Sequence, residues 1–291
     1  MNNKNDHLIS VVIPCFNSGQ TIKRAVNSIH NQTWLNKEII IVNDGSNDKK
    51  TISILNDISY VKIFNQENKG LSSARNNGAK NSLGTFLLFL DADDWLEPNA
   101  LELMYSKLID NRNKSYVYSD IKLEGESNNL IRKEYNFFEQ LFLNQLPYCI
   151  LIYKNIWEQV GGYDEEMKLG YEDWEFNIRL GSKGFYGIRV DQTLFHYSVN
   201  TSGMLISKSS KYHAKIWNFI KAKHKDLYRP FNLIRLWFLW KDKKSSYPLF
   251  FFFVWFIMLL IFPDKFVSFL FIRLRNIKWF FARGKFLNKK G

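Results

Sequence analysis

The chain of 291 residues carries a net charge of +12, is 46% hydrophobic and 16% aromatic, and contains two cysteines, Cys15 and Cys149. This length allows one large or two small domains with a packed core, and the apolar content excludes a disordered chain. Two cysteines are too few for a disulfide framework, and the polar first residues contain no apolar stretch of signal-peptide length. We therefore expect a globular protein in the reducing cytoplasm.

The first hundred residues alternate short β-rich runs with amphipathic stretches. Amphipathic residues 21–31 and 72–82 predict helices. Four apolar runs are typical of strands that are buried on both faces, namely residues 8–13, 38–42, 60–64 and 85–90. This β-α-β-α order predicts a mainly parallel sheet, and in such sheets ligands bind at the carboxyl ends of the strands.

Polar or turn-forming residues follow each of these predicted strands. Residues 14–17 follow the first strand, residues 43–46 the second, and residues 68–70 the third. The helix predicted after the third strand carries Arg75 and Asn76. Because the carboxyl ends of parallel strands meet at one edge, we expect these segments to lie close together there.

Three carboxylates, Asp91, Asp93 and Asp94, directly follow the fourth predicted strand. Carboxylates this close repel one another unless a divalent cation joins them to a phosphate-bearing ligand. An isolated Asp-x-Asp triplet is more often a solvated turn, but the position of this one at the shared edge favours a metal and a nucleotide. Asp94 is equally compatible with capping a helix that begins near Pro98.

Four motifs in this order resemble the family 2 glycosyltransferases over roughly residues 8–200. They are VVIPCFNSGQTI, NDGSNDKKT, NKGLSSARNNG and FLLFLDADDWLEPNAL, each at the end of a predicted strand or at the start of the helix after it. The resemblance implies an α/β GT-A nucleotide-diphospho-sugar transferase fold with a Rossmann-like, mainly parallel sheet. It also implies an inverting, non-processive transferase of the bacterial glycan-assembly type, with a UDP-sugar donor and Mn²⁺ or Mg²⁺.

The resemblance implies a donor-binding role for five residues. Pro14 and Asn17 match a loop that packs on the base and ribose, and Asp44 matches a carboxylate that hydrogen-bonds the uracil. Arg75 matches a position near the base and diphosphate, and Asp91 faces the ribose side. Asp44 with the following glycine is also a common turn pair, and Arg75 is also compatible with a solvated helix face.

The resemblance also implies the metal ligands and the base. Asp93 matches the metal-binding carboxylate, and His196 matches a histidine that often completes the metal or diphosphate shell, although a lone histidine is more often structural. Asp173 matches the catalytic base at the start of a predicted helix, where acidic residues also serve as ordinary caps. Glu172 and Trp174 are then candidate contacts of the acceptor.

Residues 204–291 differ from the rest of the chain. They contain 19 Lys and Arg and 3 Asp and Glu, a net charge of +16, whereas residues 1–203 carry −4. Residues 249–262 are uncharged and apolar, but a membrane-spanning helix needs about 20 residues. Residues 228–240 and 265–281 mix aromatics with sparse Lys and Arg, as helices in a membrane surface do.

We expect two regions, a GT-A catalytic domain over residues 1–203 and a helical, membrane-associated region over residues 204–291. The second region would lie on, or re-enter, the cytoplasmic face of the plasma membrane near anionic lipid. The alternative is that its helices pack onto the catalytic domain and its charges form a solvated rim. Nucleic acid gives no reason for fourteen uncharged residues in a row, so we expect no nucleic-acid partner.

The predicted reaction is transfer of one sugar to a lipid-linked oligosaccharide or glycan acceptor in cell-surface polysaccharide or lipopolysaccharide assembly. The chain lacks the Gln-x-x-Arg-Trp signature and the several spanning helices of processive members. A sugar nucleotidyltransferase would carry a glycine-rich basic loop after the first strand. The remaining alternative is a catalytically inactive membrane-anchored scaffold, against which the presence of Asp44, Asp93 and Asp173 argues.

Overall fold

The computed structural model describes residues 7–111, 115–199, 212–246, 248–262 and 266. Within these residues one sheet has the strand order β3-β2-β1-β4-β8-β6-β9-β5, with β7 paired to β6. The strands are β1 (Ile9–Cys15), β2 (Lys37–Asp44), β3 (Lys62–Gln66), β4 (Phe86–Phe89), β5 (Trp95–Leu96), β6 (Ser115–Gly125), β7 (Leu130–Ile131), β8 (Leu151–Tyr153) and β9 (Tyr186–Val199).

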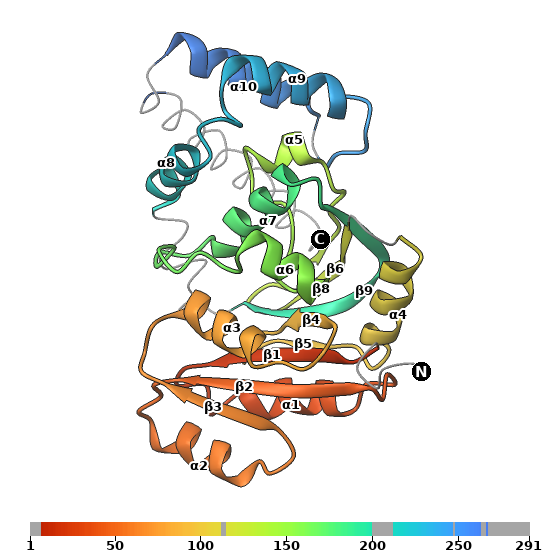
Figure 1. Ribbon diagram of the computed structural model, residues 1–291, viewed down its shortest axis with the longest axis vertical. Helices are drawn as coiled ribbons and strands as arrows, with labels where there is room; N and C mark the ends of the chain where they lie inside the picture. Colours follow the sequence, from red (N-terminus) through yellow and green to blue (C-terminus); the bar gives the residue numbers. More distant parts are fainter. Residues whose placement is uncertain (1–6, 112–114, 200–211, 247, 263–265, 267–291) are drawn as a thin grey trace, which may run out of the picture.

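The helices lie on both faces of the sheet and beyond one end of it (Figure 1). They are α1 (Ile22–His30), α2 (Lys49–Asp57), α3 (Leu71–Lys80), α4 (Ala100–Ile109), α5 (Phe137–Gln140), α6 (Lys154–Val160), α7 (Glu172–Ser182), α8 (His213–Lys223), α9 (Pro230–Trp240) and α10 (Phe250–Ile261). Strands β1 to β4 pair in parallel, whereas β8 is antiparallel to both β4 and β6.

The predicted strands and helices of the first hundred residues are confirmed as β1 to β4, α1 and α3. The sequence reading missed α2, which buries only Thr51, Ile54 and Leu55 and therefore shows a weak apolar pattern. Its start is fixed by Asp48, whose side chain accepts a hydrogen bond from the backbone N–H of Thr51 at 2.8 Å. Strand β3 lies at the sheet edge and is partly exposed, so the prediction that it is buried on both faces is wrong.

Alternate residues of the strands pack into two different cores. Val11 and Ile13 of β1 join α1, α2 and α4 on one face of the sheet. Val12 points to the opposite face and packs with Ala79 of α3 and Trp157 of α6. This alternation follows from the two-residue repeat of a strand, and it gives the central strands the continuous apolar character seen in the sequence.

At the amino ends of the parallel strands, one carboxylate joins four segments of the chain. Glu38 of β2 accepts hydrogen bonds from Ser10 of β1, Lys62 of β3 and the backbone N–H groups of Leu83 and Gly84, just before β4. Burial alone would raise the pKa of Glu38, but the bonds from Lys62, Ser10 and Leu83 outweigh burial and lower it. The ionised side chain therefore stabilises the register of this edge.

A third core joins α5 and α7 to the C-terminal helices. Trp174 and Ile178 of α7 pack in one apolar cluster with Trp217 of α8, Leu233 of α9 and Trp255 of α10. Figure 1 shows α9 and α10 beyond α5 and α7, at the opposite end of the molecule from α2 and β3. The described C-terminal helices thus pack onto the rest of the fold through α5 and α7, as the alternative to membrane association predicted.

The predicted boundary between residues 203 and 204 lies outside the described residues, as does nearly all of the helix predicted over residues 265–281. The apolar stretch 249–262 contains helix α10. Among the residues that the structure describes, no helix combines the length and the apolar character needed to cross a membrane.

Candidate active site

The end of β2 is organised by Asp44. This carboxylate is 4% exposed and accepts hydrogen bonds from Gln66 Nε2 at 2.8 Å and from the backbone N–H groups of Lys69 at 2.8 Å and Gly70 at 2.9 Å. Gly45 follows with φ +72°, and a Cβ there would lie 2.8 Å from the backbone nitrogen of Asn68, in the loop before α3. Asp44 therefore joins the end of β2 to the loop that opens α3.

Asn17 connects the loop after β1 to the loop after β2. Its Oδ1 accepts the N–H groups of Asn47 at 2.9 Å and Asp48 at 3.2 Å, and its Nδ2 donates to Asn47 Oδ1. Asn17 has φ 51°, which asparagine tolerates better than most residues. Pro14 is buried inside β1, so the exposed part of this loop begins at Phe16, whose side chain is 47% exposed.

Arg75 lies beneath the site and bridges two acidic segments. Its guanidinium donates to Asp91 Oδ1 and Glu172 Oε1, each at 2.7 Å, and lies over the rings of Tyr148 and Tyr163. Arg75 is 0% exposed, so the solvated-face alternative is wrong. Burial opposes its charge, but the two carboxylates outweigh burial and raise its pKa. Arg75 thus joins the segment after β4 to the first turn of α7.

Asp94 is buried and is not a helix cap. It accepts the backbone N–H of Ser198 at 2.7 Å and the hydroxyl of Tyr148, whereas the N-cap position of α4 is held by Asn99. Burial, together with the negative charges of Asp93 and Asp91, raises the pKa of Asp94. Asp94 therefore links residues 91–94 after β4, here called the acidic segment, to β9 and to the loop before β8.

Asp93 is the more accessible of this adjacent pair of carboxylates. Burial and the charge of Asp91 raise its pKa to about 6. Its backbone carbonyl accepts hydrogen bonds from Arg24 Nη2 at 2.5 Å and from the Ser198 hydroxyl. The backbone is thus fixed from α1 and β9, while among the described residues no other side chain donates a hydrogen bond to the Asp93 carboxylate, which accepts one from its own backbone N–H.

The first turn of α7 presents Asp173. Its Oδ1 accepts the backbone N–H of Trp174 at 2.8 Å, and its Oδ2 accepts Asn144 Nδ2 at 3.0 Å. Burial raises the pKa of Asp173, and it raises the pKa of Glu172 to about 7 despite the opposing charge of Arg75. A carboxylate with a raised pKa is a stronger base, so this position suits proton abstraction.

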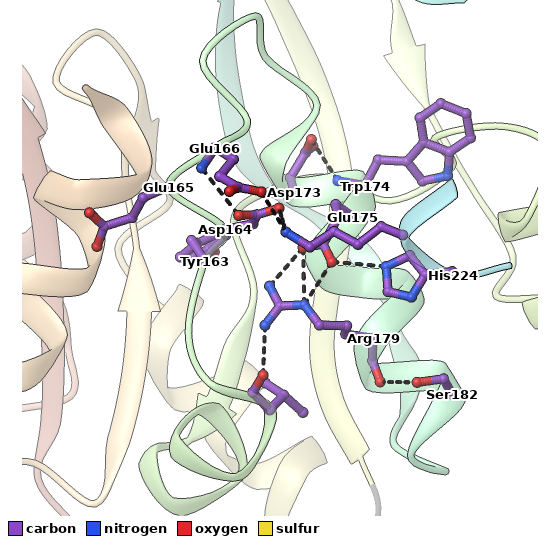
Figure 2. Close-up of polar contacts among 12 residues, drawn as sticks. Tyr163, Asp164, Glu165, Glu166, Asp173, Trp174, Glu175, Arg179, Ser182 and His224 are labelled. Atoms are coloured by element: carbon purple, nitrogen blue, oxygen red, sulfur yellow. Dashed lines mark hydrogen bonds and ion pairs between the residues drawn. The ribbon is translucent and has the colours of Figure 1, made fainter. Parts of the chain in front are cut away.

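Behind this turn, α7 is held to α8 by a buried polar network (Figure 2). Glu175 accepts three hydrogen bonds from Arg179 and faces His224 Nε2 at 2.9 Å. Burial would raise the pKa of Glu175, but His224 and Arg179 together lower it. Lys223 at the end of α8 forms an ion pair with Asp164. The helix that carries Asp173 is thus fixed from the C-terminal region.

His196 forms hydrogen bonds to two carboxylates outside the acidic segment. Its Nε2 lies 2.7 Å from Glu97 Oε1, its Nδ1 lies 3.0 Å from Glu124 Oε1, and its ring stacks on Trp95. A metal role would require one ring nitrogen to leave its carboxylate, while the other could keep its hydrogen bond. Ser198, on the same face of β9, is the residue of this strand that contacts the acidic segment.

Residues 10–174, more than half of the chain, match the family model described as Glycosyl transferase family 2. The chain belongs to glycosyl transferase family 2. The GT-A fold and the glycosyltransferase class predicted from the four motifs are therefore confirmed.

Two relatives show the extent of the similarity. The glycosyltransferase GlyA of Streptococcus pneumoniae is 38% identical over 111 residues, which cover 36% of this chain and 16% of that protein. The Escherichia coli UDP-Glc:alpha-D-GlcNAc-diphosphoundecaprenol beta-1,3-glucosyltransferase WfgD is 32% identical over 120 residues, which cover 40% of this chain and 47% of that protein. The match thus spans less than half of either relative.

A similar fold occurs in the crystal structure of S. aureus TarS 1-349 in complex with UDP-GlcNAc. The TM-score is 0.61 at 17% identity, and the match covers 81% of this chain and 74% of that chain. At this identity the likeness establishes the GT-A fold alone.

Three site residues of this family 2 glycosyltransferase were not found from the sequence. Asn144, Tyr148 and Ser198 contact Asp173, Asp94 and the backbone of the acidic segment, respectively. Asn144 and Tyr148 lie in an irregular segment between α5 and β8, where no periodic pattern marks them. Ser198 carried one signal, because it lies two residues after His196 in the sequence.

Proposed function

We propose that this glycosyltransferase moves one sugar from a UDP-sugar to a hydroxyl of a lipid-linked glycan, with inversion at the anomeric carbon. The observation that carries the proposal is the double ion pair of Arg75 with Asp91 and Glu172. It joins the acidic segment after β4 to the turn that presents Asp173. The carboxylates proposed to bind the donor, Asp91 and Asp93, and the candidate base Asp173 therefore belong to one site.

The donor nucleotide would lie at the carboxyl ends of β1 and β2. A carboxylate has about four acceptor positions, and three at Asp44 are used within the protein, which leaves one for a base N–H such as that of uracil. Asn17 holds the adjacent loop, Pro14 is buried within β1 one residue before its end, and the exposed ring of Phe16 offers a stacking surface.

The acidic segment fits a divalent cation. Burial first, and then the charge of Asp91, raise the pKa of Asp93, and no other side chain of the described residues donates a hydrogen bond to its carboxylate. Mn²⁺ or Mg²⁺ at a nucleotide is typically held by one or two carboxylates together with the phosphates. Asp93, with Asp91 beside it, would hold such an ion, which would stabilise negative charge on the departing diphosphate.

In the proposed reaction, Asp173 takes the proton from the acceptor hydroxyl while the hydroxyl oxygen attacks the anomeric carbon. The bond from that carbon to the UDP oxygen breaks, and UDP leaves from the opposite face. One displacement inverts the configuration without a covalent sugar intermediate. Arg75 and Glu172 fix the backbone turn of Asp173 relative to the donor side.

A panel of UDP-sugars tests this function. UDP release is measured with Mn²⁺ for UDP-glucose, UDP-galactose and their N-acetyl derivatives, beside Asp93→Ala and Asp173→Asn. We expect one donor to be hydrolysed slowly, with loss of turnover in Asp93→Ala. If the wild-type protein neither turns over any donor nor binds UDP in the presence of Mn²⁺, the proposal is overturned.

We further propose that the enzyme works at the cytoplasmic face of the plasma membrane through α9 and α10. One side of each helix packs in the third core, and the other exposes large apolar side chains, with Phe231 77%, Phe238 63%, Phe250 67% and Phe251 68% exposed. Exposed cations beside them would favour an anionic lipid surface; they are Arg235, Lys241, Lys243 and Lys244.

Vesicle sedimentation tests the membrane proposal. We expect the protein to bind vesicles that contain phosphatidylglycerol more tightly than pure phosphatidylcholine. Phe231→Ser combined with Phe238→Ser should reduce binding. Leu35→Ser, at a side chain that is 86% exposed in the N-terminal region, is the matched control and should have no effect. Equal binding by both variants would contradict the assignment of this face.

A further inference from the structure

Asn144 is the side chain that contacts the carboxylate of Asp173 from outside α7. We propose that Asn144 is a positioning residue, which holds the Asp173 carboxylate in one orientation and is itself held by the C-terminal helices. The inference rests on the proposed function, in which Asp173 is the base. It adds a residue from outside the four motifs and gives the C-terminal helices a role in catalysis.

The geometry fixes both oxygens of the base. Oδ1 of Asp173 accepts the backbone N–H of Trp174 at 2.8 Å, and Oδ2 accepts Nδ2 of Asn144 at 3.0 Å. Because an ionised carboxylate only accepts hydrogen bonds, Asn144 must present its NH₂ group and not its oxygen to Asp173. With one donor on each oxygen, rotation of the carboxylate about its Cβ–Cγ bond would break both bonds.

The segment that carries Asn144 is attached to the C-terminal region three residues earlier. The carbonyl of Leu141 accepts hydrogen bonds from the Tyr228 hydroxyl at 2.7 Å and from Trp217 Nε1 at 3.3 Å. The next side chain, Phe142, is buried against Phe252 and Trp255 of α10, with ring centroids 5.6 and 5.5 Å apart. A continuous set of contacts therefore runs from α8 and α10 to the candidate base.

The charged and titratable groups that face Asp173 come from several elements. They are Arg75 of α3, Glu172 of α7, Asp91 after β4, Tyr163 before α7 and Tyr197 of β9. Arg75 and the Asn144 donor stabilise the ionised form of Asp173, while burial and Asp91 oppose it. Loss of Asn144 therefore removes a stabilising donor, and the midpoint of Asp173 titration should move to higher pH.

Carbon-13 NMR of protein labelled at the aspartate carboxyl carbon tests this directly, without any substrate. The resonance of Asp173 is the one that Asp173→Asn removes. Asn144→Leu keeps the side-chain volume and deletes the donor, and Asn129→Leu, on the exposed turn before β7, is the matched control. We expect a higher titration midpoint in Asn144→Leu and no change in Asn129→Leu. An unchanged or lower midpoint would overturn the proposal.

The pH profile of UDP release provides the second measurement. With the donor that the UDP-sugar panel identifies, we expect Asn144→Leu to lower kcat about tenfold at neutral pH, the effect of one hydrogen bond to a charged group. The acidic limb of the profile should shift to higher pH, and KM for the donor should stay unchanged. A loss at every pH without a shifted limb would indicate a structural role only, and would overturn positioning.

The Tyr228→Phe variant tests the connection to the C-terminal helices. It removes the hydroxyl that binds the Leu141 carbonyl and leaves the ring, so we expect a smaller shift in the same direction. No shift would remove the C-terminal helices from the proposal. Full activity of Asp173→Asn would instead overturn the base assignment itself, an outcome that is distinct from failure at Asn144.

Discussion

The region around the parallel strands and the region around α7 build their parts of the site in different ways. In the first, Asn17, Asp44 and Asp93 lie at or just beyond the carboxyl ends of β1, β2 and β4, whose parallel register places these ends together. In the second, Asp173 depends on Asn144 and on contacts from α8 and α10, which lie far along the chain. The comparison teaches that strand register places Asp44 and Asp93, with Ser198 of β9 also holding the Asp93 backbone. The Asp173 carboxylate instead contacts Asn144, whose segment packs against α8 and α10.

Removal of the C-terminal helices should have the largest effect. A chain ending at residue 211 uncovers Phe138 of α5, Trp174 of α7 and Phe142, which follows α5. We expect a destabilisation greater than that of deleting one large core side chain, about 3–5 kcal/mol. Urea unfolding and size-exclusion chromatography measure it, with a chain ending at residue 262 as control. A monomeric, cooperatively unfolding short form would contradict the shared core.

Substitution of the bridging arginine should come next, because Arg75 joins the two regions. Arg75→Met leaves Asp91 and Glu172 without their buried partner, which typically costs about 3–5 kcal/mol. The pair of Lys62 with Glu38, in which the lysine side chain is 46% exposed, is the control, and Lys62→Met should cost about 1 kcal/mol or less. Urea denaturation measures both. Equal losses would show that burial of the bridge is unimportant.

The polar contact between α7 and α8 can be measured by a double-mutant cycle. Glu175→Gln and His224→Ala, alone and together, should give a coupling of about 1–2 kcal/mol, because one partner is a buried charge. The same cycle on the exposed pair of Asp226 and Arg229 should give nearly zero. Free energies of unfolding from urea titrations supply the values. A coupling energy near zero for Glu175 and His224 would show that this contact does not stabilise the packing of α7 on α8.

At the amino end of β2, Glu38→Gln should lower the free energy of unfolding by about 1 kcal/mol at neutral pH, since an ionised acceptor is replaced by a neutral one. The folded-state pKa of Glu38 is lowered, so its contribution is full above the unfolded pKa and is lost as pH falls through the folded pKa. The variant and the wild type should therefore converge in acid. Stability measured by urea unfolding from pH 7 to pH 3 tests this.

Asp93→Asn should affect stability least while it abolishes turnover. The folded-state pKa of Asp93 is about 6, above its ordinary value of 3.8, so wild-type stability decreases as pH rises between these values. The variant should lack this decrease and be at least as stable as wild type above pH 6. Thermal unfolding at pH 5 and pH 8, beside UDP release, measures the two effects. If Asp93→Asn were clearly less stable than wild type at pH 8, burial and the charge of Asp91 would not destabilise the ionised Asp93.

The two regions also differ in how far the sequence predicts them. Apolar runs and the motifs after them predict β1, β2 and β4 and the positions of Asp44 and Asp93, because both strand and site residue lie in one short segment. The weak pattern of α2 and the edge exposure of β3 were missed. Asn144 could not be predicted, because its role depends on contacts between segments that are distant in sequence.

The apolar face of α7 has a consequence for synthesis of the protein. Trp174 and Ile178 share a core with residues of α5 and of α8 to α10, such as Phe138, Trp217 and Phe256. On the ribosome, the central sheet can therefore assemble while α7 still exposes this face to the cell. Chaperones that bind exposed aromatic segments would act on the nascent chain in that interval, until the last helices leave the exit tunnel.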